Sequence, residues 1–192
     1  CLVLALVGCG SKEPVASKLS IFAEDGGKKI AYTVIRAKNS SAQIDDAAKK
    51  IRSSLKAGFG GMVKMTYDET VEDFDGNLEI LIGNTNREET QKAKEVLKNN
   101  RESYYLDFII KVIGDKIVIY SENEAMLIKA VDYFAETYCK DEEAWNKLDT
   151  STEIIYEAPI VSRPHEIGGV TLNNFTIVTP RDMEYIYGRA IY

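Results

Sequence analysis

The stretch Tyr105-Leu-Asp-Phe-Ile-Ile-Lys-Val-Ile-Gly-Asp-Lys-Ile-Val-Ile-Tyr-Ser121 decides the fold of this chain. Two apolar runs rich in Ile and Val are separated by Gly114 and Asp115, and glycine tolerates the positive φ of a two-residue turn. Alternate residues of the first run share one face of a strand: Leu106, Phe108, Ile110 and Val112. The stretch predicts a β-hairpin with an apolar face.

Three amphipathic helices are predicted around this hairpin. Each begins with Ser or Thr followed three residues later by Glu or Gln, which is the pattern of a capping box: Ser40 with Gln43, Thr85 with Glu88, and Ser121 with Glu124. Apolar residues then recur at helical spacing. In the third helix the apolar face comprises Leu127, Val131, Phe134 and Tyr138.

Four further strands are predicted at residues 30–36, 62–66, 77–82 and 152–156. The resulting order is β-α-β-β-α-β-β-α-β. Because each helix carries a single apolar stripe, it needs to cover only one side of a sheet. The prediction is an α/β (α+β) two-layer sandwich, with a mixed β-sheet and helices packed on one face.

The beginning of the chain has the pattern of a bacterial lipoprotein. Residues 1–8 are mostly apolar and are interpreted as the remnant of a signal peptide. Leu6-Val7-Gly8-Cys9 resembles a lipobox, which predicts lipidation of Cys9 and a tether over residues 9–28. A lipidated cysteine carries a diacylglycerol and an amide-linked acyl chain, and more than one chain gives stable attachment to a membrane. The predicted location is therefore the extracellular face of the cell membrane, with the lipid as anchor. The alternative is a buried first strand that contains Gly-Cys.

The end of the chain repeats an earlier pattern. Leu172-Asn-Asn-Phe-Thr-Ile-Val-Thr-Pro180 matches the apolar pattern of Ile30-Ala-Tyr-Thr-Val-Ile-Arg-Ala37. The predicted domains are therefore an α/β module at 29–158, then a linker and the start of a truncated second unit at 159–192. A missing C-terminal domain of the same protein is an expected partner.

Composition narrows the possible functions. The net charge of −6 leaves no basic stripe to neutralise phosphates, so nucleic acid is not an expected partner. If residues 1–8 are removed and Cys9 carries lipid, only Cys139 remains, and no internal disulfide is predicted. Cys139 ends the third helix and is expected to be a buried or half-buried thiol.

The segment between the strand at 77–82 and the second helix is a candidate anion site. Asn84, Thr85 and Arg87 lie where a helix begins, and helix N-termini attract anions. The alternative is that Asn84 and Thr85 satisfy the turn and cap the helix.

No metal, cofactor or catalytic residue is predicted. The acidic loop at 68–76 does not have the ligand spacing of an EF-hand and is interpreted as solvated. His165 is the sole histidine and is interpreted as a linker residue. Trp145, in a polar stretch, is the preferred candidate for an exposed platform that contacts a glycan.

A resemblance adds a functional expectation. Glu79-Ile-Leu-Ile-Gly-Asn-Thr-Asn-Arg87, the hairpin and the helix ending Phe134-Ala-Glu-Thr-Tyr138 resemble the small α/β domain that precedes the barrel in family-20 β-hexosaminidases. They also resemble N-terminal domains of α-glucuronidases and a unit of clostridial-type lipoproteins. Relatives often carry Pro after the Arg, where this chain has Glu88. The family's catalytic carboxylates lie in the barrel, so the resemblance transfers no catalytic residue.

The resemblance implies a non-catalytic accessory module of a carbohydrate-associated surface protein, anchored by lipid. Two alternatives remain open at this point. The first is the N-terminal part of a glycoside hydrolase whose catalytic domain is missing from this chain. The second is a surface lipoprotein that binds a protein or a solute.

Overall fold

A computed structural model describes residues 16–23, 29–70, 77–100, 106–158, 166–167 and 170–171. The chain divides into two units, Cys1–Ala158 and Pro159–Tyr192. The described part of the second unit is a short antiparallel pair, β7 (Glu166–Ile167) and β8 (Val170–Thr171). The first unit contains the candidate site.

The first unit follows the predicted order of strands and helices and adds two short helical turns, η1 and α4. Its elements in chain order are β1 (Thr33–Arg36), α1 (Ala42–Phe59), β2 (Lys64–Tyr67), η1 (Asp68–Thr70), β3 (Glu79–Ile82), α2 (Glu88–Asn100), β4 (Asp107–Ile113), β5 (Lys116–Tyr120), α3 (Glu124–Tyr138), α4 (Glu142–Trp145) and β6 (Glu153–Glu157).

The strands form one mixed sheet in the order β2-β1-β3-β5-β4-β6. Strands β2, β1, β3 and β5 run parallel to one another, whereas β4 runs antiparallel to both β5 and β6. The hairpin is confirmed, because Ile113 pairs with Lys116 across a two-residue turn in which Gly114 has a φ of 60°. The mixed α/β class is likewise confirmed.

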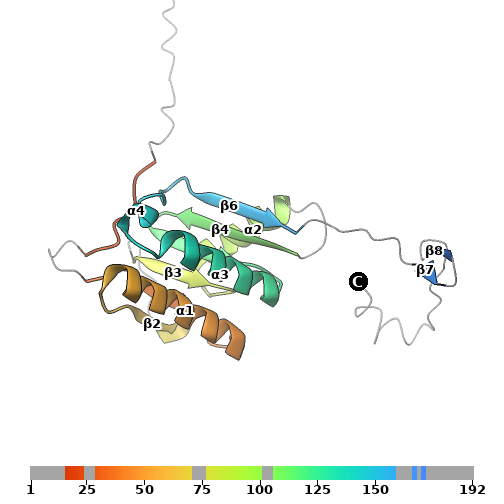
Figure 1. Cartoon of the computed structure of the whole chain (residues 1–192), viewed down its shortest axis with the longest axis horizontal. Helices are drawn as coiled ribbons and strands as arrows, with labels where there is room; N and C mark the ends of the chain where they lie inside the picture. Colours follow the sequence, from red (N-terminus) through yellow and green to blue (C-terminus); the bar gives the residue numbers. More distant parts are fainter. Residues whose placement is uncertain are drawn as a thin grey trace, which may run out of the picture. The chain divides into compact units, whose positions relative to one another are not determined.

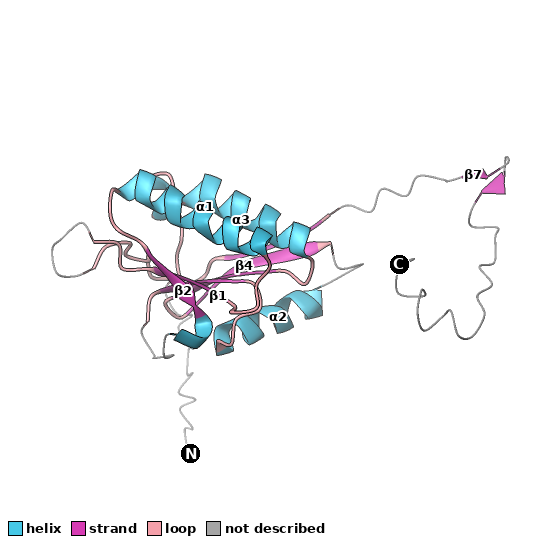
Figure 2. Cartoon of the chain, turned by 90° about the horizontal axis from the view of Figure 1, so that it is seen from below, coloured by secondary structure: helices cyan, strands magenta, loops and turns pink. Residues whose placement is uncertain are grey.

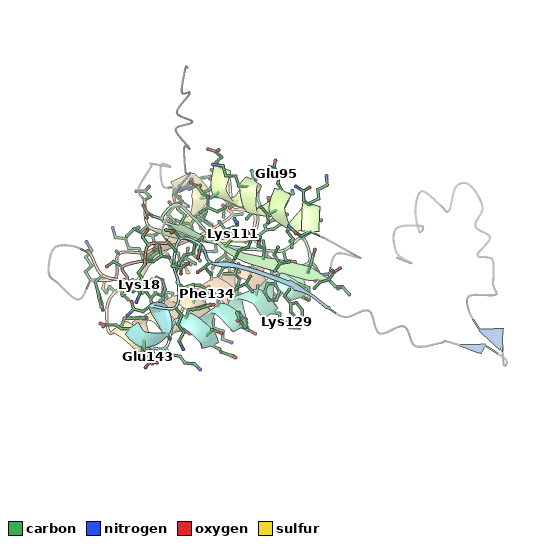
Figure 3. The ribbon with its side chains drawn as sticks, turned by 90° about the horizontal axis from the view of Figure 1, so that it is seen from above. Lys18, Glu95, Lys111, Lys129, Phe134 and Glu143 are labelled. Carbon is green, nitrogen blue, oxygen red and sulfur yellow. The ribbon has the colours of Figure 1, made fainter. Side chains whose placement is uncertain are left out.

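The prediction that the helices lie on one face of the sheet is wrong. Helices α1 and α3 cover one face, and α2 lies on the other (Figure 2). In the stick view, Glu95 of α2 and Lys129 of α3 are on opposite sides of the sheet (Figure 3). The reason lies in the central strands: β3 and β5 are buried along their whole length, as is typical of strands that need cover on both faces.

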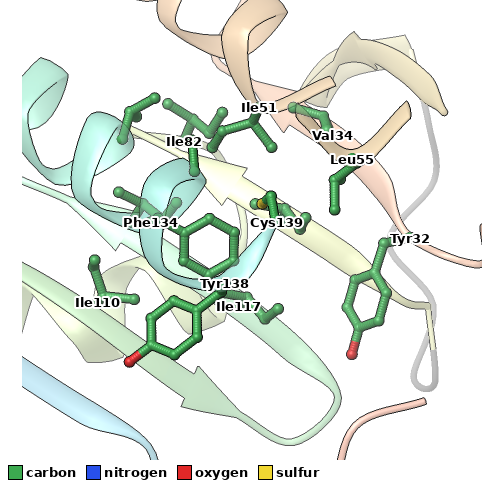
Figure 4. Packing of buried hydrophobic residues seen from close by; sticks show 14 of the residues in the cluster. Tyr32, Val34, Ile51, Leu55, Ile82, Ile110, Ile117, Phe134, Tyr138 and Cys139 are labelled. Atoms are coloured by element: carbon green, nitrogen blue, oxygen red, sulfur yellow. The ribbon is translucent and has the colours of Figure 1, made fainter. Parts of the chain in front are cut away.

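The larger core lies between the sheet and the pair α1 and α3. Phe134 and Tyr138 of α3 point toward sheet residues such as Ile110 and Ile117 (Figure 4). Cys139 is 1% exposed beside them, and this burial raises the pKa of its thiol to about 12. The expectation of a buried or half-buried thiol is therefore confirmed.

The smaller core lies under α2. Ala93 and Leu97 of that helix pack against apolar residues that the strands present on this face: Ile35, Leu81, Ile109, Val118 and Tyr120. An amphipathic stripe specifies that a helix covers a sheet, but not which face it covers. The sequence pattern therefore predicted correctly that α2 is an amphipathic helix packed on the sheet. It could not predict which face of the sheet the helix covers.

The helix starts differ from the predicted capping boxes. Ser41 caps α1 by accepting a hydrogen bond from the Ile44 backbone N–H, one residue later than predicted. Asn123, rather than Ser121, caps α3. In each case a neighbouring side chain with a suitable acceptor occupies the capping position.

Candidate functional site

A crevice lies at the carboxyl ends of β1 and β3. These strands are neighbours, but the chain leaves β1 for α1 on one face and leaves β3 for α2 on the other. Such a reversal separates the two loops, and ligands of open α/β sheets bind at this topological position. The pocket between the loops has a volume of about 490 Å³, which is within the usual range for small-molecule sites.

Neutral polar side chains dominate the lining of this crevice. The β1–α1 loop contributes Asn39 and Ser40, the β3–α2 loop contributes Asn84 and Asn86, and α2 contributes Gln91. The lining also contains one more hydroxyl residue, three charged residues, two apolar residues and a glycine: Thr85, Lys38, Asp68, Glu69, Ala37, Ile44 and Gly83. Amide groups offer donors and acceptors in one plane, which suits ligands with several hydroxyl groups.

Asp68 ties the two walls of the crevice together. One carboxylate oxygen accepts a hydrogen bond from the Lys38 backbone N–H at 3.1 Å, and the other accepts from the Asn86 backbone N–H at 2.8 Å. The side chain is 5% exposed, and η1 positions it directly after β2. Asp68 thus fixes the separation of two loops that are far apart in sequence.

Arg87 does not line the crevice. Its guanidinium forms a two-point ion pair with Glu79, with Nε to Oε2 at 3.0 Å and Nη2 to Oε1 at 3.1 Å, and both side chains are 2% exposed. It also donates to the Asp68 carbonyl oxygen at 3.1 Å and to Asn86 Oδ1 at 2.8 Å. Arg87 therefore joins the β3–α2 loop to the sheet instead of presenting its charge to a ligand.

The other two residues of the predicted anion site do reach the crevice. Asn84 is exposed there, whereas Thr85 is 1% exposed and its hydroxyl is 2.6 Å from that of Thr90. The structure brings together Asn84 and Thr85, as expected, but places Arg87 elsewhere. Binding of an anion at this place stays a prediction.

The expectation that Trp145 is an exposed platform is wrong, because Trp145 is 1% exposed. Its indole Nε1 donates to the Leu19 carbonyl oxygen at 2.9 Å. Its ring lies edge-on to Tyr32, Phe59 and Phe134, with centroid separations of 5.1, 6.0 and 6.4 Å. The polar stretch around Trp145 folds into the short turn α4, whose apolar side faces the core. A buried indole cannot stack on a sugar.

An aromatic group at the α3–β6 edge is partly exposed. Tyr133 is 42% exposed, and Tyr156 stacks on Phe108 with a centroid separation of 5.1 Å. Lys129 Nζ lies 4.1 Å from the centre of the Tyr156 ring. This surface is separate from the crevice and offers an alternative location for binding.

Several predicted features fall outside the described residues: Cys9, His165 and the acidic residues Glu72, Asp73 and Asp75. Within the described ranges, no three His, Cys, Asp or Glu residues are grouped so that they could hold a metal ion. No helix in this part of the chain is both long enough and apolar enough to cross a membrane.

The sequence did not identify Asn39, Ser40, Asn86 or Gln91 as site residues. They lie on two loops and a helix that are distant in sequence and are brought together by the order of β1 and β3 in the sheet. Exposed amides at loops are common, so no local pattern distinguished them.

Comparisons with known proteins found likeness to solved structures but no match to a family model or a curated protein. Among solved structures, a family GH115 4-O-methyl-α-glucuronidase with specificity for decorated arabinogalactans is similar at a TM-score of 0.41 and 10% identity. The match covers 65% of this chain and 17% of that enzyme.

Proposed function

We propose that this chain is a lipid-anchored, extracellular, non-catalytic accessory module of a carbohydrate-associated surface protein. The observation that carries its role as an accessory module is that the chain enters the first unit at one end of the sheet and leaves it at the other. A domain with this geometry acts as a spacer between its N-terminal and C-terminal flanking segments.

The entry lies at the amino ends of the parallel strands. Ser17 exchanges hydrogen bonds with Thr150, its carbonyl oxygen accepting from the Thr150 backbone N–H at 3.0 Å. Leu19 and Ile21 are each 5% exposed, and the segment continues through the Phe22–Ile30 bridge toward β1. Figure 1 shows this segment, in red, beside α4.

The exit lies at the opposite end. Strand β6 runs in the same direction as β3, because β4 is antiparallel to both β5 and β6. After β6, the Ala158 backbone N–H donates to the Leu106 carbonyl oxygen at 2.8 Å. The carboxyl end of the sheet therefore holds both the crevice and the exit of the chain. Lipid on Cys9 would direct the other end toward the membrane.

Association with carbohydrate is supported by the sequence resemblance and by the neutral polar lining of the crevice. A non-catalytic role is supported by the state of the carboxylates there. Hydrolysis of a glycosidic bond ordinarily needs two carboxyl groups that are free to act on the bond. Asp68 uses both of its oxygens on backbone N–H groups, and Glu69 is paired with Lys38 at 2.5 Å.

The anchor is tested by Cys9→Ser in the intact gene product, expressed in a bacterium that processes lipoproteins. We expect the parent protein to incorporate labelled palmitate and to sediment with membranes, and Cys9→Ser to do neither. Cys139→Ala is the matched control, because this cysteine is buried in the core and should leave labelling unchanged. Equal labelling of the parent and Cys9→Ser would contradict the proposal.

The non-catalytic role is tested on the same intact protein. If it hydrolyses glycosides, Asp68→Asn should leave kcat unchanged, because the reacting carboxylates would lie in another domain. Loss of hydrolysis in a folded Asp68→Asn protein would instead assign the chemistry to this unit.

A further inference from the structure

We propose that the crevice between the β1–α1 and β3–α2 loops binds a neutral, polyhydroxylated ligand of monosaccharide to disaccharide size. This inference deepens the proposed function, and its choice of ligand class rests on it. Three features of the crevice support the site: uncommitted amides, fixed walls and a net negative charge.

Three side-chain amides of the lining are uncommitted. Asn39, Asn84 and Gln91 are exposed, and their amides make no hydrogen bond within the described part of the chain. Each amide offers two N–H donors and one carbonyl acceptor. They come from the loop after β1, the loop after β3 and the first turn of α2, so they approach a ligand from different sides.

The walls that carry these amides are fixed from behind. The two hydrogen bonds to Asp68 join the loops, and the Ser40 hydroxyl donates to the Ala37 carbonyl oxygen at 2.6 Å. Asn86 Oδ1 accepts a hydrogen bond from Arg87 at 2.8 Å, which holds this side chain against the β3–α2 loop. Groups that are already held in place lose less conformational entropy when they bind a ligand.

The charge of the crevice disfavours an anionic ligand. Its charged side chains are Lys38, Asp68 and Glu69, and Lys38 is already paired with Glu69. With Lys38 and Glu69 paired, the carboxylate of Asp68 leaves the lining with one net negative charge, which repels an anion. Ala37 and Ile44 add a small apolar surface, which suits the C–H face of a pyranose ring. A saccharide combines these properties: many hydroxyl groups, no charge and an apolar face.

The experiment is a ¹⁵N-NMR titration of the full chain carrying Cys9→Ser. The probes are cellobiose, lactose and N,N′-diacetylchitobiose, with glucose 6-phosphate as an anionic sugar and trialanine as an amide-rich peptide. The backbone N–H signals of Lys38 and Asn86 report directly on the crevice, because both groups bond to Asp68. We expect a neutral saccharide to shift these signals and to bind more tightly than the phosphorylated sugar.

Two variants test the assignment. The double variant Asn39→Ala/Asn84→Ala removes two uncommitted amides and should weaken saccharide binding about tenfold or more, given the usual strength of such hydrogen bonds. Asn99→Ala is the matched control, since it removes an exposed amide from the far end of α2. It should leave the affinity unchanged.

Three outcomes would overturn the proposal. They are the absence of shifts with every saccharide, shifts confined to the surface around Tyr133 and Tyr156, and binding of trialanine but not of saccharides. None of these results bears on the lipid anchor, which is measured by palmitate labelling of the intact protein. A failure of the binding site and a failure of the anchor are therefore distinguishable.

Discussion

The two ends of the sheet are built differently. At the amino end, Trp145 packs edge-on against Tyr32, Phe59 and Phe134, and the N-terminal segment covers the group. At the carboxyl end, the loops after β1 and β3 present amides and hydroxyls around an open crevice. The first end excludes water and the second is accessible to it.

This difference indicates where stability and recognition lie in the molecule. Burial of large aromatic rings contributes several kcal/mol to folding, whereas exposed amides contribute little. Substitutions at the amino end should therefore change the free energy of unfolding, and substitutions at the crevice should change binding alone. Four predictions test that division, from the largest expected effect to the smallest.

The largest effect is expected for Trp145→Ala. Removal of the buried indole leaves a cavity, and such truncations cost about 3–5 kcal/mol. The measurement is urea unfolding followed by far-UV circular dichroism, because the variant lacks the sole tryptophan that fluorescence would report. A loss below about 1 kcal/mol would show that the aromatic group does not hold the amino end together.

Gly58→Ala should destabilise the protein, although alanine normally favours a helix. A Cβ at this position of α1 would lie 2.3 Å from the Cys139 carbonyl oxygen and 2.6 Å from that of Lys140. Overpacking of this kind costs about 1–3 kcal/mol and exceeds the gain in helix propensity. The free energy of unfolding should fall, and the control Ala57→Gly, at the neighbouring exposed position, isolates the propensity effect.

Tyr32→Phe is expected to have a small effect of opposite sign. The Tyr32 hydroxyl is buried without a hydrogen-bond partner among the described residues, and burial, with a smaller contribution from Asp115, raises its pKa. Removing an unsatisfied polar group relieves its desolvation cost, so we expect a gain of about 1 kcal/mol. A loss of stability in thermal unfolding would indicate that the hydroxyl has a bonded partner in solution.

The smallest effect on stability is expected for Asn39→Ala/Asn84→Ala. Both side chains are exposed, and changes at such positions usually stay within about 0.5 kcal/mol each. Thermal unfolding should match that of the parent protein even though saccharide binding is weakened. A large loss of stability would remove the distinction between the two ends of the sheet.

Most of the secondary structure was predictable from local patterns. The alternation in β4 and β5 and the Gly114–Asp115 turn identified the hairpin, because the period of two and the turn chemistry both act within a few residues. The buried face of α3 followed from helical spacing for the same reason. The exact capping residues were missed, since several polar side chains near each helix start compete for one position.

The environment of single side chains was less predictable. Trp145 lies in a polar stretch and was expected to be exposed, yet the N-terminal segment, 126 residues away in sequence, supplies its hydrogen-bond partner. Arg87 was a candidate for contact with an anion, but Glu79 on the adjoining strand pairs with it. Both outcomes depend on groups that share no local pattern with the residue in question.

The sequence by itself determined the order of strands and helices, the hairpin and the apolar face of each helix, because these depend on short-range periodicity and turn chemistry. Only the tertiary structure decided that α2 lies opposite α1 and α3, and that β1 and β3 are neighbours. These two choices create the crevice. The placement of α2 satisfies the burial of both faces of the central strands, a requirement of the whole sheet rather than of any one segment.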